Sequence, residues 1–227
     1  MGDPRSLPPG LERRREIALA GHRGDVATAR AALTDVDGRV RATALGALAR
    51  AGALTVDDLA RGAGDPEAVV RRRVAEAAAA ADPPGAIATV QALLDDDDAS
   101  VVEAAAWACG ELTLDGAADG GADADADAGR ADDARHGVVD RLSHLAVEHE
   151  DALVREAAVA ALGSIGDERG LAAILAAASD KPAVRRRAVL ALAPFEGADV
   201  DAALTRALTD RDWQVRQAAE DLSEPDG

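Results

Sequence analysis

Aromatic side chains are almost missing from this sequence. Its 227 residues include two tryptophans, one phenylalanine and no tyrosine. Large rings supply much of the buried area in most protein cores. A core that lacks them must be built from Ala, Leu and Val, which contribute little area each, so we expect helices that pack closely together.

Paired cysteines and long apolar runs are missing as well. Cys109 is the single cysteine, which excludes an intrachain disulfide and favours a reducing compartment. No apolar run approaches the ~20 residues of a membrane span, and residues 1–6 lack the apolar centre of a signal peptide. We therefore expect a cytoplasmic protein without a membrane partner.

Lysine is the third scarcity. Lys181 is the only lysine, and 42 acidic residues against 25 basic ones give a net charge of −17. Aspartate far outnumbers glutamate. This composition resembles that of cytosolic proteins from extreme halophiles such as haloarchaea. The alternative is an acidic protein encoded by any GC-rich genome.

What the sequence does contain is a repeat. Residues 151–165 hold its best copy, with the core Val-Arg-x-Ala-Ala-x-x-Ala-Leu-Gly. Each copy contains a pair of residues that begins with valine, and the copies are aligned on this pair. The second residues of successive pairs lie 30, 32, 52, 30 and 31 residues apart, and an acidic insertion accounts for the long interval. A fixed period in this range is typical of solenoid proteins. The pairs are Val40-Arg41, Val70-Arg71, Val102-Glu103, Val154-Arg155, Val184-Arg185 and Val215-Arg216.

Each copy has the apolar spacing of a helix, and its arginine lies beside the apolar face. At 100° per residue, Arg155 projects within about 20° of Leu162, and a charge in that position needs a partner. We predict a ladder in which each arginine pairs with an aspartate of its own or a neighbouring repeat; an arginine extended to solvent is the alternative. These aspartates also lie where a side chain can cap the helix. The ladder residues are Arg41, Arg71, Arg155, Arg185 and Arg216, with Asp35, Asp65, Asp180 and Asp210 five or six positions before an arginine.

One copy breaks the pattern. In this alignment Glu103 occupies the arginine position, and Asp97 precedes it by six residues. Decay of the repeat beside the insertion is one explanation. The other is a weak seam at residues 95–134 about which the two halves flex.

The Asp-x-x-x-x-Val-Arg-x-x-Ala-x-x-Ala-Leu runs resemble the HEAT-repeat family, in its short phycobilisome-lyase-like form. The resemblance covers roughly residues 30–222. It implies an all-α fold, a right-handed α-solenoid of about six helical pairs. A fold of this kind does not specify a chemical activity.

The organisation that we expect is one elongated solenoid at residues 11–222, with disordered ends at 1–10 and 223–227. Residues 115–133 are rich in Asp, Gly and Ala without apolar periodicity, so we predict a disordered acidic loop. The expected helices are 11–20, 25–33, 38–50, 55–62, 67–81, 84–94, 99–114, 134–147, 151–165, 168–178, 182–194, 199–208 and 212–222.

Candidate chemistry is sparse. His136, Asp140 and His144 recur at i+4 and are the candidates for a metal site, but their stripe lies on the side of the helix opposite to its apolar residues. Asp123, Asp125 and Asp127 begin like a calcium loop, although the glycine and the final glutamate of such a loop are missing. The HEAT-repeat deoxyhypusine hydroxylases hold iron with several His-Glu pairs, and here His149-Glu150 is the single pair. We therefore expect no metal and no cofactor.

Arginine triplets at 13–15, 71–73 and 185–187 are candidates for phosphate contacts. The negative net charge and the missing aromatics disfavour nucleic acid as the partner. We predict that the first arginine of each later triplet belongs to the ladder. Cys109 lies in an apolar helix, which favours a buried thiol over a nucleophile.

The function that fits best is a non-catalytic adaptor or scaffold that binds another protein, with the chain itself monomeric. The alternative is a lyase-like enzyme, or an enzyme-associated subunit, that acts on a protein-bound cofactor. We expect each helix with a Val-Arg pair to pair with the helix after it, as 38–50 with 55–62. By family resemblance, the second helix of each pair lines the concave side. The candidate surface residues are Asp57, Asp58, Arg61, Gln91, Asp140, His144, Glu168 and Arg169.

Overall fold

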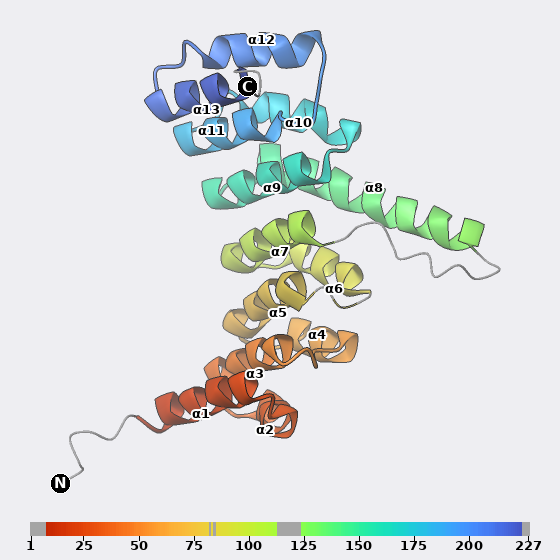
Figure 1. Ribbon diagram of the computed structural model, residues 1–227, viewed down its shortest axis with the longest axis vertical. Helices are drawn as coiled ribbons and strands as arrows, with labels where there is room; N and C mark the ends of the chain where they lie inside the picture. Colours follow the sequence, from red (N-terminus) through yellow and green to blue (C-terminus); the bar gives the residue numbers. More distant parts are fainter. Residues whose placement is uncertain (1–7, 82, 84, 113–123, 224–227) are drawn as a thin grey trace. The chain divides into compact units, whose positions relative to one another are not determined.

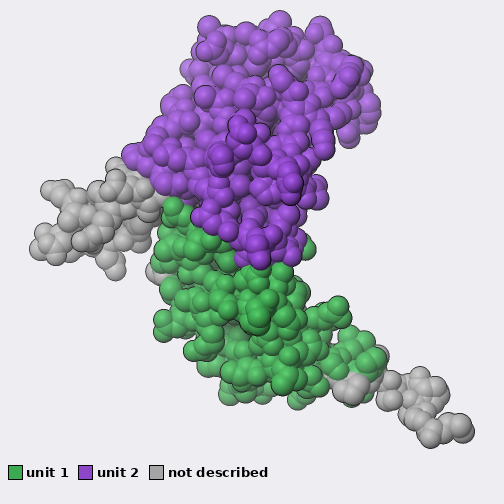
Figure 2. Space-filling view, turned by 180° about the vertical axis from the view of Figure 1, so that it is seen from behind, with its two compact units in different colours: residues 1–93 green, residues 94–227 purple. Residues whose placement is uncertain are grey.

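The computed structural model describes residues 8–223 except 82, 84 and 113–123. All the regular secondary structure in the described residues is helical and consists of thirteen α-helices and three short 3₁₀ helices. The predicted all-α helical-repeat fold is confirmed. The chain divides into two compact units, residues 1–93 and 94–227 (Figure 2).

In the first unit, α1, α3 and α5 lie side by side, and α2, α4 and α6 form a second row (Figure 1). Helix α3 packs on α2, and α5 packs on α4. The helix with the Val-Arg pair therefore packs on the helix before it, whereas the sequence analysis paired it with the helix after it. The bounds are α1 (Pro9–Arg23), α2 (Val26–Ala31), η1 (Ala32–Thr34), α3 (Gly38–Arg50), α4 (Val56–Ala63), α5 (Ala68–Ala81) and α6 (Ala86–Ala92).

The second unit repeats this arrangement. Helices α7, α9, α11 and α13 form one row, and α8, α10 and α12 form the other (Figure 1). The bounds are α7 (Ala99–Glu111), α8 (Ala124–Glu148), α9 (Ala152–Ile165), η3 (Glu168–Gly170), α10 (Leu171–Ala177), α11 (Pro182–Ala191), α12 (Ala198–Ala207) and α13 (Trp213–Ser223); η2 (Leu93–Asp95) lies at the division between the units.

Helix α8 is longer than predicted. It begins at Ala124, so the second half of the stretch predicted as a loop is helical; residues 113–123 lie outside the described residues. The prediction relied on missing apolar periodicity. Alanine favours a helix without any apolar face, and aspartates in a first turn complement the helix dipole. The buried part of α8, which includes Val138 and Leu142, then fixes the rest in register.

Close helix contacts replace the missing aromatic rings. A Cβ on Gly163 of α9 would lie 2.6 Å from Cα of Ala191 in α11, and one on Gly110 of α7 would lie 2.9 Å from Cα of Ala161 in α9. These helices approach through glycine and alanine, which explains the Ala-Leu-Gly end of the repeat. Packing at this distance gains dispersion energy that small side chains could not otherwise supply.

Helix α1 of the first unit and helix α13 of the second carry charge at positions where other helices of the same unit carry apolar residues. Four residues after the ladder position, α9 and α11 have the buried Val159 and Val189, whereas α13 has the exposed Glu220. Helix α1 has the exposed Glu16 at the position of Ala44 in α3, which is fully buried. Polar outer faces of this kind are typical of capping repeats.

Candidate functional site

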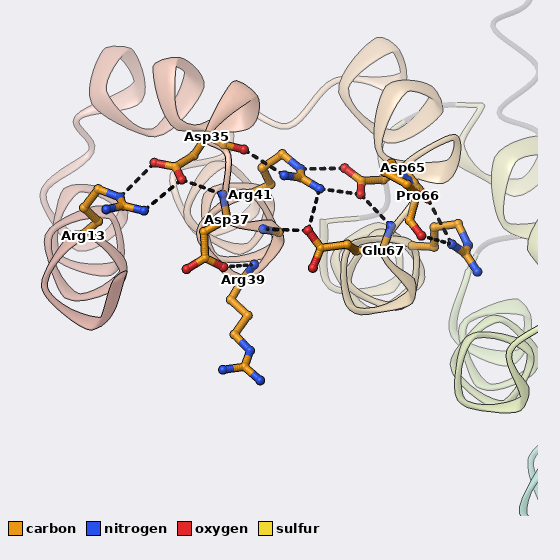
Figure 3. Close-up of polar contacts among 10 residues, drawn as sticks. Arg13, Asp35, Asp37, Arg39, Arg41, Asp65, Pro66 and Glu67 are labelled. Atoms are coloured by element: carbon orange, nitrogen blue, oxygen red, sulfur yellow. Dashed lines mark hydrogen bonds and ion pairs between the residues drawn. The ribbon is translucent and has the colours of Figure 1, made fainter. Parts of the chain in front are cut away.

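The arginines and aspartates of the first unit form a connected network (Figure 3). Nε and Nη2 of Arg41 each donate to a carboxylate oxygen of Asp65 at 2.7 Å, and Nη1 donates to the main-chain oxygen of Asp35 at 2.8 Å. The guanidinium thus joins its own repeat to the next one. Asp65 also accepts the N–H of Glu67 at 2.9 Å, which fixes the turn before α5.

The same geometry recurs in the second unit. Arg155 binds both carboxylate oxygens of Asp180, and Arg185 binds both oxygens of Asp210 at 2.9 and 2.7 Å. The two arginines are only 9% and 6% exposed. Hydrogen bonds from these arginines lower the pKa of Asp180 and of Asp210 below the ordinary value, despite the opposing effect of burial. The pairs stay ionised and hold adjacent repeats together, so their charges are not open to a ligand.

The capping role falls to a different residue from the predicted one. Asp37, not Asp35, caps α3 by accepting the N–H of Arg39 at 2.9 Å. Asp35 accepts the N–H of Asp37 and the guanidinium of Arg13. Arg13 is therefore a further ladder residue that the sequence analysis missed, although its spacing of 28 residues from Arg41 is a usable signal.

The two remaining ladder arginines, Arg71 and Arg216, also bind main-chain oxygens that precede their own helices. Arg71 donates to the main-chain oxygens of Asp65 and Pro66 at 3.0 and 3.2 Å. Arg216 donates through Nη1 to the main-chain oxygen of Asp210 at 2.7 Å, the contact that anchors each arginine to its own repeat. Among the described residues, no carboxylate binds the outer edge of Arg216.

The predicted break in the ladder lies one residue earlier than the alignment placed it. Asp98 caps α7 through the N–H of Ser100, as Asp37 caps α3, and the ladder position four residues after the cap is Val102. Val102 is 2% exposed. Glu103 therefore does not occupy the arginine position. The interpretation was wrong because two valines in a row allowed either register.

The position that holds the aspartate partner in the next repeat also carries a different residue. His149 holds the place of Asp35: its Nδ1 accepts the N–H of Asp151 at 3.1 Å, and its main-chain oxygen accepts Arg155 at 2.7 Å. An apolar residue and a histidine thus replace the arginine and the aspartate together. Neither a buried arginine nor a buried aspartate is left without its partner.

The predicted binding-surface residues of the first unit are not all on the surface. Asp57 and Arg61 of α4 are exposed, and Gln91 of α6 is half-buried. Asp58 is 3% exposed, so its assignment to a binding surface is wrong. It closes a capping box with Thr55 and binds Arg30 of α2 at 2.8 Å, because the first turn of α4 faces α2. Arg30 is a second structural arginine that the sequence analysis missed.

Of the predicted surface and metal-site residues in the second unit, Asp140 and Arg169 are in contact with each other. Asp140 accepts two hydrogen bonds from Arg169 at 2.8 and 2.9 Å. Glu168 and His144 are exposed, and His136 is half-buried. The described residues contain no group of three or more His, Cys, Asp or Glu able to hold a metal ion.

The thiol of Cys109 lies in the interior of the second unit. Cys109 is fully buried, and burial raises the pKa of its thiol to about 12, which keeps it protonated. None of the described helices combines the length and apolar character needed to cross a bilayer.

The exposed tryptophans are the feature that the sequence analysis did not assign. Trp107 of α7 is 45% exposed and Trp213 of α13 is 64% exposed. Trp213 lines a shallow hollow of about 140 Å³ together with Arg186 and Leu190 of α11. Helical spacing places both tryptophans on the side of this row that faces away from α8, α10 and α12.

Comparisons with known proteins concern the fold. The family model described as HEAT repeats matches residues 56–128, 124–193 and 139–223. No curated protein matches the chain. Crystal structures of three engineered proteins are similar to it: one at 22% identity and a TM-score of 0.63 over 86% of this chain and 94% of that one, one at 23% and 0.64 over 87% and 96%, and one at 20% and 0.63 over 95% and 64%.

Proposed function

The chain belongs to the HEAT-repeat family, and from that premise we propose that it is a non-catalytic scaffold that binds a protein partner. The binding surface is the outward side of α7, α9, α11 and α13. This surface differs from the one expected from the sequence, which lay on the other row of helices.

The observation that carries the proposal is the exposure of both tryptophans in a chain with three aromatic residues. A core so poor in large side chains would gain from burying them, because each aromatic ring buries 150–250 Å² or so. Tryptophan is also enriched among the residues that dominate the binding energy of protein interfaces. We therefore assign Trp107 and Trp213 as the residues of this chain that anchor a protein partner.

The surroundings of Trp213 support a partner with an apolar anchor of its own. The hollow beside Trp213 is lined by the aliphatic Leu190, by Arg186 and by the amides of Gln214 and Gln217. An apolar centre with a polar rim is the usual anatomy of a protein interface. Arg155 and Arg185, the ladder arginines deeper in the same row, are neutralised by Asp180 and Asp210, so they do not compete for the partner.

The test is capture from a native extract in molar KCl, followed by affinity measurement with the purified partner. We expect W107A/W213A to bind at least tenfold more weakly than wild type, since a tryptophan that anchors an interface commonly contributes 2 kcal/mol or so. The matched control V36A/L208A removes two exposed apolar side chains elsewhere and should stay within about twofold. Circular dichroism checks that each variant is folded.

Two outcomes contradict the proposal. One is that wild type retains no specific protein; the other is that W107A/W213A binds as wild type does. A third variant, Q91A/H144A, tests the surface expected from the sequence, and loss of binding there alone would move the site to the other row. The lyase-like alternative and the phycobilisome-lyase-like subtype stay predictions, as does a cytoplasmic location.

A further inference from the structure

Charge is distributed unevenly between the two units. Residues 1–93 contain 13 arginines and 12 acidic residues, a net charge of +1, whereas residues 94–227 contain 12 basic and 30 acidic residues, a net charge of −18. The whole of the acidic excess therefore belongs to the second unit. Ten of the thirteen arginines of the first unit lie on α1, α3 and α5.

These arginines form what we call the basic face, on the side of α1, α3 and α5 that faces away from the second row. Helical spacing places its members within about 100° of one another around each helix. The side chain of Arg73 in α5 reaches α3. A Cβ on Gly46 of α3 would lie 3.8 Å from the Cδ and Nη1 atoms of Arg73. The members are Arg14 and Arg15 of α1, Arg39 and Arg50 of α3, and Arg72 and Arg73 of α5.

Few carboxylates neutralise the basic face. Glu76 pairs with Arg72 at 3.1 Å and with Arg73 at 2.9 Å. In the described part of the chain, the guanidinium groups of Arg15, Arg39 and Arg50 make no hydrogen bond or ion pair. The guanidinium of Arg39 points away from the ladder carboxylates in Figure 3, although its main-chain N–H binds Asp37.

Arg14 is a half-buried member of the basic face. Its Nε atom is covered and lacks a hydrogen-bond partner among the described residues, as do the Nε atoms of Arg141 and Arg187 outside the face. The neighbouring Arg13, by contrast, is held by Asp35 through two hydrogen bonds of 3.0 and 3.2 Å.

We infer that the basic face binds an acidic segment of a partner protein. This inference rests on the proposed function and names a second, chemically different contact on the same scaffold. Helices that pack 8–10 Å or so apart match an extended chain with an acidic residue at about every third position, since each residue of such a chain advances about 3.3 Å.

Carboxylates fit this face better than the phosphates of a nucleic acid. The first unit contains no tryptophan, tyrosine or phenylalanine on which bases could stack. Guanidinium groups of the same helices already bind carboxylates through two hydrogen bonds, as Arg41 binds Asp65.

The experiment measures binding of a fluorescein-labelled deca-glutamate peptide to the full chain in 0.1 M KCl or so. We expect R15Q/R39Q/R50Q to weaken binding about tenfold, since three exposed ion pairs of modest strength are lost. The control R61Q/R206Q/R211Q removes the same charge at exposed arginines elsewhere and should weaken binding less than threefold or so. Circular dichroism verifies the fold of both variants.

Three results overturn the inference: no binding of the peptide by wild type, equal weakening by the two triple variants, or tighter binding of a ten-residue oligothymidylate that R15Q/R39Q/R50Q abolishes. The last result would make the face a nucleic-acid site. The W107A/W213A protein should bind the peptide as wild type does, so failure of the tryptophan surface and failure of the basic face give different results.

Discussion

At the residue scale, Arg185 and Arg216 occupy the same position in successive repeats but have different partners. Arg185 is 6% exposed and binds both carboxylate oxygens of Asp210. Arg216 is half-buried, and among the described residues it binds only the main-chain oxygen of Asp210. Substituting each arginine in turn therefore distinguishes the contribution of the ion pair to stability from that of the backbone contact that both arginines make.

We expect R185M to lower the free energy of unfolding by about 3 kcal/mol, because it leaves the carboxylate of Asp210 without its counter-charge. The matched R216M should cost about 1 kcal/mol, the value of one hydrogen bond. Urea unfolding of both variants measures the difference. Equal costs would show that the ion pair adds nothing to the backbone contact.

Acid should weaken the ladder. Hydrogen bonds from Arg155 and Arg185 lower the folded-state pKa of Asp180 and Asp210 below the ordinary value of 3.8. A carboxyl whose pKa is lowered by folding contributes stability above its unfolded pKa, and that contribution is lost as the pH falls through the folded value. We expect the free energy of unfolding to fall below about pH 4 for this reason.

The variant D210N tests the assignment, because its amide does not titrate. Its unfolding free energy should be lower than that of wild type at neutral pH and should decline less steeply in acid. Parallel acid profiles for the two proteins would assign the loss to other carboxylates.

At the element scale, α7 and α9 are adjacent helices that lack a ladder pair between them. Val102 and His149 occupy the two positions, and contacts of another kind join these helices. Ser164 of α9 donates to the main-chain oxygen of Gly110 in α7 at 2.7 Å. With a buried valine at one position and a histidine at the other, neither position holds a buried charge without its partner.

Restoring the pair requires both substitutions. V102R alone should cost about 3 kcal/mol, since it buries a cation without a carboxylate. In V102R/H149D the new aspartate can accept the guanidinium, and we expect a favourable coupling of about 1 kcal/mol or more in a double-mutant cycle. The control E103R, outside the ladder, should change stability by less than about 0.5 kcal/mol. Additive effects of V102R and H149D would show that the two positions do not meet.

At the scale of the whole molecule, the excess of negative charge lies in residues 94–227. Like charges repel in the compact state. Salt screens this repulsion, since the Debye length falls from about 10 Å at 0.1 M to about 3 Å at 1 M. The second unit, not the first, should therefore respond to salt.

We expect the melting temperature to be higher in 1 M KCl or so than in dilute buffer. Hydrogen exchange at the two salt concentrations should slow more in α9 and α11 than in α3 and α5. A flat melting temperature would remove both this expectation and the halophile interpretation, and equal slowing in the two units would remove its link to local charge.

The sequence by itself determined the helical repeat. Periodic Val, Ala and Leu specify a buried helix face wherever the chain places it, and the 30-residue spacing requires each copy to pack on its neighbours. The positions of most helices follow from these local signals. The acidic half of α8 does not, because its helical state depends on propensity and on attachment to a packed helix instead of on an apolar face of its own.

The tertiary structure decided which residue of each copy does what. The sequence pattern allows either Val102 or Glu103 at the arginine position of the repeat. Only the helix cap at Asp98 shows that Val102 occupies it. It also cannot show that Asp58 is buried against Arg30, or that Trp107 and Trp213 are exposed, because these outcomes depend on contacts between helices distant in the chain. Periodicity specifies which side of a helix is apolar, and packing against neighbouring helices decides which polar or aromatic side chains remain open to a partner.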